Sequence, residues 1–172
     1  MSVKTILTEP NKILRQVSKN VDKVGDEERE LMDDMLDTMY DAPGIGLAAI
    51  QIGLPKRIIV MDISRDENKK EPMYFVNPVI KNKNEEKAKY EEGCLSVPDQ
   101  FAEIERPNTC EVEYLDYNGK KKLLKAEGLL ATCIQHEMDH LEGILFIDYL
   151  SKLKKSMIIK KLSKIKANRN IF

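Results

Sequence analysis

The sequence contains no tryptophan, and it has only two histidines and three cysteines among its 172 residues. No apolar run approaches the roughly 18 residues that cross a bilayer, so a membrane-spanning protein is excluded. The first ten residues hold no apolar core followed by small residues at a cleavage site, which argues against a signal peptide. We therefore expect a cytoplasmic protein with no membrane attachment.

The three cysteines, Cys94, Cys110 and Cys133, are an odd number in a chain without an export signal. A disulfide framework is unusual in the reducing cytoplasm, so each thiol is expected to be buried or to bind a metal. Charged residues make up 33% of the chain and hydrophobic residues 42%, which excludes disordered and collagen-like classes. At this length, residues 1–172 are expected to form a single globular domain.

Charge is distributed unevenly along the chain, although the formal net charge is only −1. From residue 149 to residue 172 there are eight basic residues and no acidic one. Apolar residues recur through this tail, so the pattern predicts a basic, amphipathic C-terminal helix over residues 149–168. They are Leu150, Leu153, Met157, Leu162 and Ile165. Such a basic face is usually a solvated surface, and docking to ribosomal RNA is the alternative that the charge suggests.

The hydrophobic patterns predict a first helix, then several strands, then a second helix. Because the strands are grouped ahead of the second helix, we expect an α+β fold rather than a series of βαβ units. The expected helices are 26–40, capped by Asp26, and 129–142; the expected strands are 57–63, 74–77, 111–115 and 122–124, the last two forming a hairpin.

The two histidines fall in His136-Glu137-Met138-Asp139-His140, an H-E-x-x-H pattern inside a predicted helix. Residues four apart lie about 40° apart around a helix and ~6 Å along it, so both imidazoles can reach one metal ion. Glu137 lies about 100° from His136, close enough to act as general base on a water bound to that ion. The alternative is a pair of unrelated helix histidines, which requires the only two in the chain to fall four apart by chance.

A catalytic metal site needs a third protein ligand and an open position. In many zinc metallopeptidases that ligand follows the motif, and Gly143 matches the glycine of the longer H-E-x-x-H-x-x-G-x-x-H signature. Phe146, however, stands where the last histidine would be, and no His, Cys or Glu follows Gly143. We therefore expect the third ligand to come from upstream.

Two upstream thiols compete for this position. Cys133 lies one turn before His136 on the same helix and cannot reach the ion, so we expect a small apolar residue near the site instead. Cys94 follows Gly93 in a turn where a thiol can face a pocket, but the residues alone leave a ligand and a structural thiol equally open. Cys110 is expected in the core.

Three stretches taken together resemble the peptide deformylase family, in its bacterial form with a C-terminal helix. They are Gly44-Ile45-Gly46-Leu47-Ala48-Ala49-Ile50-Gln51, Glu92-Gly93-Cys94-Leu95-Ser96 and Gln135-His136-Glu137-Met138-Asp139-His140. Without the resemblance, residues 44–51 are best explained as a glycine-containing turn entering a buried strand. The resemblance covers nearly the whole chain and implies antiparallel or mixed β-sheets packed around a central helix that carries the histidines.

The resemblance also implies a reaction, the removal of the formyl group from the N-terminal formylmethionine of newly synthesised proteins, with release of formate. It implies that Cys94, His136 and His140 bind Fe²⁺, for which Zn²⁺, Ni²⁺ or Co²⁺ can substitute. The expected partners are therefore N-formylmethionyl nascent peptides and, through the basic helix, the ribosome. We expect a monomer in the bacterial cytoplasm.

The resemblance assigns roles to residues around the metal. Glu137 is expected to be the general base, while Gln51 and the backbone N–H of Leu95 stabilise the oxyanion. Gly46 is expected to hold the peptide backbone, and Ile45, Leu95 and Cys133 to lie near the methionine side chain.

Two other functions stay open at this point. A zinc metallopeptidase of H-E-x-x-H type would cut internal peptide bonds, and a non-catalytic metal- or ribosome-binding protein would leave Glu137 without a role. The sequence departs from the family at Phe101, where several relatives carry an arginine, and at Thr132, where an aliphatic residue is more usual. Both departures bear on substrate preference. Arg106 is expected to pair with Glu92 behind the metal site.

Overall fold

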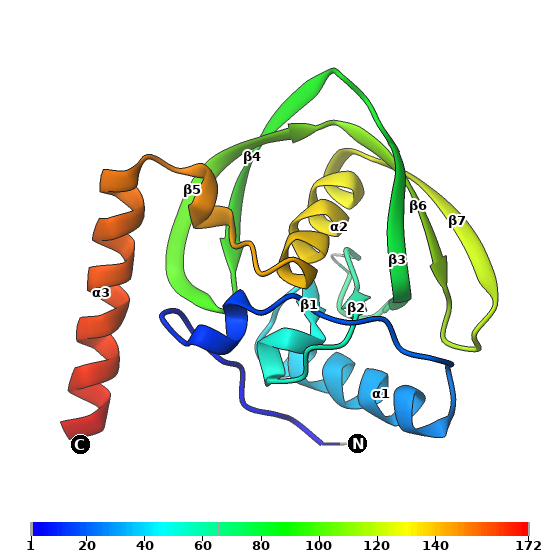
Figure 1. Ribbon diagram of the computed structural model, residues 1–172, viewed down its shortest axis with the longest axis horizontal. Coiled ribbons are helices and arrows are strands. Elements are labelled where there is room, and N and C mark those ends of the chain that lie inside the picture. The colour runs from blue at the N-terminus through cyan, green and yellow to red at the C-terminus, as the bar shows by residue number, and fades with distance from the viewer. Residues whose placement is uncertain (1, 65, 172) are drawn as a thin grey trace.

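The chain folds into two antiparallel β-sheets around a central helix (Figure 1). The computed structural model describes residues 2–64 and 66–171, with side chains as far as residue 165. The helices are α1 (Asp26–Asp41), α2 (Gly128–Leu141) and α3 (Lys152–Ile171), with short 3-10 helices η1 (Lys12–Arg15), η2 (Ala49–Ile52) and η3 (Phe146–Tyr149). The strands are β1 (Gly46–Ala48), β2 (Ile58–Met61), β3 (Met73–Lys83), β4 (Lys87–Cys94), β5 (Val97–Pro107), β6 (Thr109–Leu115) and β7 (Lys121–Glu127).

The larger sheet has the strand order β1-β2-β3-β6-β7, and neighbouring strands in it are antiparallel. Strands β4 and β5 form a separate ladder that runs from Lys87 opposite Pro107 to Cys94 opposite Val97. Helix α2 lies between the two sheets in Figure 1 and contacts strands of both. The expected α+β fold, with antiparallel sheets around the helix that carries the histidines, is confirmed.

Strand β2 divides the core into two layers because successive side chains of a strand point to opposite faces. Ile59 and Met61 pack in the cluster that includes Ile134 of α2, whereas Ile58 and Val60 pack against the buried methionines of α1. All four residues of the strand are fully buried. The buried strand expected over residues 57–63 is therefore confirmed, with the shorter bounds Ile58–Met61.

Helix α2 is enclosed on nearly all sides, and five of its nine buried residues are polar. Gly128, at φ +60°, makes the turn from β7 into the helix. The buried polar residues are Thr132, Gln135, His136, Glu137 and His140. Buried polar groups need hydrogen-bond partners or a ligand, so this helix has to be surrounded by groups that satisfy them.

Several local predictions differ from the structure. Asp26 is the first residue of α1 rather than its cap, and Gly25 takes the N-cap position. Strand β3 does not end before Pro78 but continues to Lys83, because a register shift between residues 76 and 79 accommodates the proline. Residues 49–52 form η2 instead of continuing the buried strand, so Gln51 lies on a helical turn.

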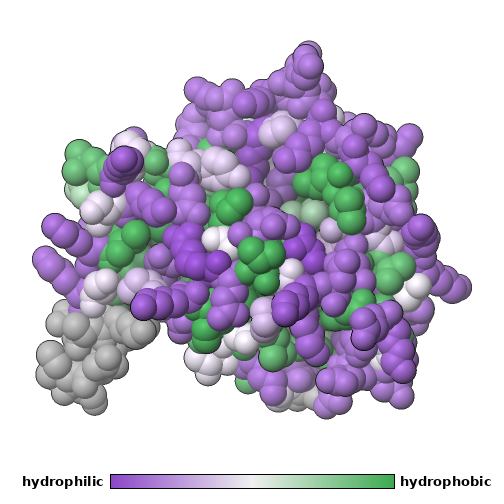
Figure 2. Space-filling view, in the orientation of Figure 1, coloured by the Kyte–Doolittle hydropathy of each residue, from purple (hydrophilic) through white to green (hydrophobic). Residues whose placement is uncertain are grey.

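The C-terminal helix begins at Lys152 rather than at residue 149, because η3 precedes it. The predicted apolar face is wrong in part: Leu162 is buried, whereas Leu153 and Met157 are 72% and 57% exposed. Instead, Ile158 and Ile159 accompany Leu162 against the residues of η3 and β5. Figure 2 shows hydrophobic atoms over α3 among the hydrophilic ones. No helix in the described part of the chain is long and apolar enough to cross a membrane.

Candidate metal centre and active site

A thiol and two imidazoles converge at the end of β4 and the middle of α2. One ligand atom from each of Cys94, His136 and His140 lies within 4.8 Å of the others, and the Cys94 Sγ is 3.3 Å from the His140 Nε2. Both imidazoles are buried, and burial holds the pKa of His140 well below its ordinary value, so this ring is neutral. Sulfur and neutral imidazole nitrogen are the ligands that suit Zn²⁺, Fe²⁺ and similar transition metals.

Cys94, the predicted third ligand, lies beside the histidines because the β4–β5 ladder ends there. Gly93 is paired with Phe101, whereas the next residue, Cys94, is paired with Val97. The register shifts between these two pairs, and the thiol lies against His140 of α2. Cys133, by contrast, is not among the three clustered residues, in agreement with the argument from helix geometry.

Glu137 is buried beside Cys94, His136 and His140, and one of its carboxylate oxygens accepts no hydrogen bond from the described residues. Its Oε1 is 4.0 Å from the His136 Nε2, and its Oε2 has no hydrogen-bond partner among the described residues. Burial raises the pKa of Glu137 to about 7. A carboxyl group with such a pKa can both accept and return a proton near neutral pH, which general acid–base catalysis requires.

Strand β1 passes close to this carboxylate at Gly46. A Cβ atom on Gly46 would lie 2.7 Å from the Glu137 Oε1, so a larger residue would displace the carboxylate. The predicted base and the predicted backbone-binding residue are therefore in direct contact.

Hydrogen bonds fix the side chain of Gln51 next to Cys94, one of the three predicted metal ligands. Its side-chain oxygen accepts a hydrogen bond from the Ala48 N–H at 2.9 Å, and its Nε2 donates to the Ser96 Oγ at 3.0 Å. The same Nε2 lies 3.6 Å from the Cys94 Sγ. Because the side-chain oxygen is occupied by the Ala48 N–H, the amide nitrogen is the end of the side chain that faces Cys94. Ser96 is completely buried, and sequence reasoning gave it no role.

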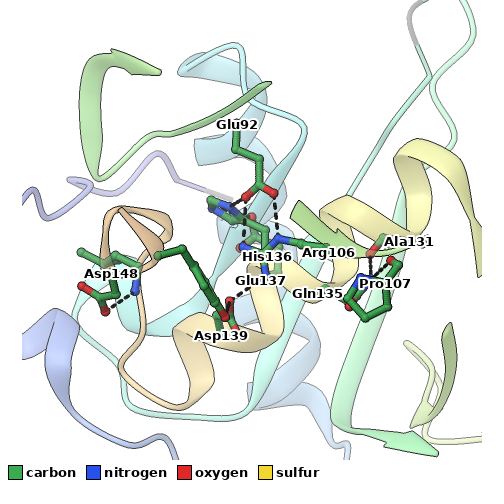
Figure 3. A network of polar contacts seen from close by, with 11 residues as sticks. Glu92, Arg106, Pro107, Ala131, Gln135, His136, Glu137, Asp139 and Asp148 are labelled. Carbon is green, nitrogen blue, oxygen red and sulfur yellow. Dashed lines mark hydrogen bonds and ion pairs between the residues drawn. The ribbon is translucent and has the colours of Figure 1, made fainter. Parts of the chain in front are cut away.

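A charged network supports His136 from behind (Figure 3). The His136 Nδ1 is 2.9 Å from one oxygen of Glu92, and Arg106 donates two hydrogen bonds to the same carboxylate at 2.7 and 3.0 Å. Although burial alone would raise the pKa of Glu92, these bonds hold it below its ordinary value. The ionised carboxylate keeps the proton on Nδ1 and leaves Nε2 to face the cluster. The pairing of Arg106 with Glu92 was expected from the sequence and is confirmed.

The network extends further than the sequence indicated. Arg106 also donates to Asp139 at 2.8 Å, and the Tyr149 hydroxyl donates to the same carboxylate at 2.7 Å. The guanidinium carbon lies 5.0 Å from the centre of the Tyr149 ring. Asp139 stands inside the H-E-x-x-H pattern, but the sequence carries no signal for its partner in η3.

A cavity of about 510 Å³ opens next to the cluster. It is lined by predicted site residues and by several that the sequence did not single out. The predicted ones are Ile45, Gly46, Cys94, Leu95, Cys133, His136 and Glu137, and the others include Tyr90 and Leu129. Thr132, named above as a departure from the family, also lines the cavity. Cys133 is 6% exposed, and burial raises the pKa of its thiol well above the ordinary value, so this wall is neutral. Gln51 and His140 lie behind the lining.

Comparison with known proteins identifies the family. The family model described as Polypeptide deformylase matches residues 3–156. The chain belongs to the polypeptide deformylase family. A peptide deformylase from Pelagibacter ubique (strain HTCC1062) is 88% identical over 171 residues, which make up 99% of each chain.

Solved peptide deformylases have the same fold. The crystal structure from Ehrlichia chaffeensis matches with a TM-score of 0.91 at 44% identity and covers 96% of this chain and 97% of that one. The structure from Legionella pneumophila has a TM-score of 0.91 at 43% identity and covers 98% of both chains. The resemblance seen in the sequence is thus confirmed, and so is the expected class of enzyme, a metal-dependent deformylase. A peptidase that cuts internal bonds and a non-catalytic binding protein lose their support.

Proposed function

We propose that this deformylase removes the formyl group from N-formylmethionyl nascent peptides, with Cys94, His136 and His140 holding Fe²⁺. The observation that carries the proposal is the convergence of these three side chains beside the buried Glu137 at the wall of an apolar-lined cavity. When bound there, a divalent ion lowers the pKa of water toward neutrality and polarises a carbonyl group. Zn²⁺, Ni²⁺ or Co²⁺ has the same preference for these ligands and can substitute.

In this proposal Glu137 moves the proton. It accepts a proton from the water as the water oxygen attacks the formyl carbon. It then returns a proton to the amine nitrogen as the bond between that nitrogen and the formyl carbon breaks. Support comes from its pKa of about 7 and from the Oε2 without a partner among the described residues.

Gln51 and the backbone N–H of Leu95 stabilise the negative charge that develops on the formyl oxygen. The support for Gln51 is that its amide is fixed by Ala48 and Ser96 and lies next to Cys94. A donor fixed in advance costs no reorganisation during the reaction, and losing one such donor lowers kcat by about 100-fold or more.

Substrate binding is assigned to the cavity lining. Gly46 holds the peptide backbone, since only glycine leaves room beside Glu137, and Ile45, Leu95 and Cys133 surround the methionine side chain. The walls formed by these three residues are apolar or neutral, which suits an uncharged thioether chain.

The decisive experiment is formate release from formyl-Met-Ala-Ser by anaerobically prepared, Fe²⁺-loaded protein. Replacement of Glu137 by Gln is expected to lower kcat by at least ~100-fold while leaving metal content unchanged, because only the proton acceptor is lost. Glu142→Gln, the same chemical change at the end of α2, is the matched control and should keep wild-type activity. A folded, metal-loaded wild-type sample that releases no formate would refute the proposed function.

We also propose that the enzyme is a monomer in the bacterial cytoplasm and that α3 docks on the ribosome. The support is the run of exposed lysines on α3, which include Lys160, Lys161 and Lys164. Replacing these three with glutamate should abolish co-sedimentation with ribosomes at low salt, whereas the same change at Lys120, Lys121 and Lys122 should not. Equal behaviour of the two triple variants would contradict docking through α3, and sedimentation as a dimer would contradict the monomer.

A further inference from the structure

The connection between α1 and β1, residues 42–45, forms part of the wall of the catalytic cavity. We call it the entry segment. A Cβ atom on Gly44, within this segment, would lie 2.6 Å from the Leu95 Cδ1. A Cβ atom on Gly46, directly after it, would lie 2.7 Å from the Glu137 Oε1. The entry segment therefore runs in close contact with two residues of the proposed reaction, and its position determines the shape of the cavity beside them.

Asp62 fastens the entry segment at both ends, although it does not line the cavity. This residue directly follows β2 and is 4% exposed. Its backbone N–H donates a hydrogen bond at 2.9 Å to the C=O of Ile45, the last residue of the segment. Its Oδ2 accepts a hydrogen bond at 2.5 Å from the hydroxyl of Tyr40, which lies on the last turn of α1 just before the segment. The two ends of the entry segment are thus joined through one buried residue.

The Asp62 carboxylate is itself fixed by the connection between β2 and β3. Its Oδ1 accepts a hydrogen bond from the Ser64 N–H and its Oδ2 accepts one from the Glu71 N–H, each at 2.9 Å. Burial and the hydrogen bond to Asp62 raise the pKa of Tyr40, so its hydroxyl stays protonated and remains a donor. The Lys70 Nζ lies 4.4 Å from the centre of the Tyr40 ring and covers its face. The entry segment is therefore attached to a support whose groups have little freedom to move.

A second tyrosine–aspartate pair on α1 provides an internal reference. The Tyr117 hydroxyl donates a hydrogen bond to the Asp33 Oδ2 at 3.2 Å and joins α1 to the turn between β6 and β7. Neither of these two residues lines the cavity. The same kind of bond on the same helix, away from the cavity lining, is a matched reference for the pair of Tyr40 and Asp62.

We propose that Tyr40 and Asp62 are positioning residues, which hold the entry segment in its substrate-binding position before the substrate arrives. The inference rests on the proposed deformylase function and adds two residues that do not line the cavity. If the segment is in place in only a fraction of the molecules, the apparent affinity for substrate falls by that fraction. The groups that carry out the chemistry lie on α2 and η2, so we expect this pair to control KM rather than kcat.

The test measures kcat and KM for formate release from formyl-Met-Ala-Ser by anaerobically prepared, Fe²⁺-loaded proteins. Tyr40→Phe, which removes only the hydroxyl, should raise KM by about 5- to 10-fold and change kcat by less than about 2-fold. Tyr117→Phe makes the same change at the reference pair and should keep the wild-type KM. Asp62→Asn should raise KM at least as much as Tyr40→Phe, and the double variant should have no higher KM than Asp62→Asn, because the two residues act through one bond.

Amide hydrogen exchange gives a second readout that does not depend on turnover. The Asp62 N–H, which is bonded to the Ile45 C=O, should exchange at least about 10-fold faster in Tyr40→Phe than in Tyr117→Phe. The reason is that release of the entry segment at Tyr40 exposes this bond to solvent more often.

The outcomes separate the positioning role from the reaction. A KM of Tyr40→Phe equal to that of Tyr117→Phe, or a loss confined to kcat, would overturn the positioning role while leaving deformylation intact. Equal exchange of the Asp62 N–H in the two variants would overturn it as well. No formate from the folded, metal-loaded wild type would overturn the proposed function, and the exchange rates would still decide whether the pair holds the entry segment.

Discussion

Helices α2 and α3 are attached to the body of the protein in different ways. α2 has 14 residues, of which nine are buried, and its polar side chains are hydrogen-bonded to the β4–β5 sheet at Glu92, Arg106 and Pro107. α3 has 20 residues and contacts the body mainly through Ile158, Ile159 and Leu162. The groups that carry out the chemistry lie on the element with the most constrained position. Most of the side chains between Lys152 and Ile165 of α3 instead face solvent, where a partner can reach them.

The largest effect should come from removing the cation of the α2 network. Arg106→Ala leaves the buried Glu92 and the partly buried Asp139 without their counter-charge, so we expect a loss of about 3–5 kcal/mol in the free energy of unfolding. Lys161→Ala on α3 removes an exposed charge and should change stability by less than about 0.5 kcal/mol. Urea denaturation curves measure both values, and an Arg106 variant as stable as the Lys161 variant would show that α2 is not held by this network.

The second effect concerns the close approach of β1 to α2. Gly46→Ala places a Cβ where the Glu137 carboxylate lies, so we expect kcat for deformylation to fall by about 100-fold, the size of effect seen when a general base loses its position. Gly25→Ala is the control, because a Cβ there meets only the end of Lys23 at 3.8 Å. Activity of the Gly46 variant close to that of the control would contradict the assigned contact.

The third effect tests how α3 is attached. Leu162→Ala removes the buried leucine of this helix, and we expect about 2–3 kcal/mol of destabilisation. Leu153→Ala makes the same chemical change at a residue that is 72% exposed and should be nearly neutral. Thermal unfolding of the two variants measures the difference, and equal melting temperatures would show that Leu162 does not anchor the helix.

The smallest effect lies at the junction between η3 and α3. Although burial alone would raise the pKa of Asp148, a hydrogen bond from Arg15 at 2.6 Å and an ion pair with Lys155 at 2.7 Å hold it below its ordinary value. A lowered folded-state pKa means that the stabilisation is fully present above the unfolded value of about 3.9 and is lost as the pH falls through the folded value. Asp148→Asn should therefore cost about 1–2 kcal/mol at pH 7, and the cost should shrink in acid. A cost that is the same at pH 7 and pH 3 would contradict this linkage.

Local patterns in the sequence predicted what depends on local geometry. The spacing of His136 and His140 on one helix, the burial of β2 and the β6–β7 hairpin all follow from periods of a few residues. The β4–β5 ladder was not predicted, because its exposed positions carry lysine and glutamate and its partner strand interrupts the pattern with Pro98.

Contacts between distant segments explain what was missed at the site. The approach of Cys94 to the histidines spans more than 40 residues, so residue chemistry left that thiol open and only the family resemblance singled it out. The contact between Tyr149 and Asp139 depends on how η3 redirects the chain. So does the orientation of α3 that packs Ile158 and Ile159 against the body. No repeating pattern within either segment encodes such a direction.

The separate two-stranded sheet gives the metal a mechanical role. Cys94 belongs to the β4–β5 sheet, whereas His136 and His140 belong to the central helix, so one bound ion would fasten two parts of the fold together. A ligand that binds only the folded state stabilises it by mass action. Oxidation of the thiol or shortage of the metal would then lower the stability of the folded state as well as the catalytic activity. Metal supply would therefore govern both the lifetime and the turnover of each enzyme molecule.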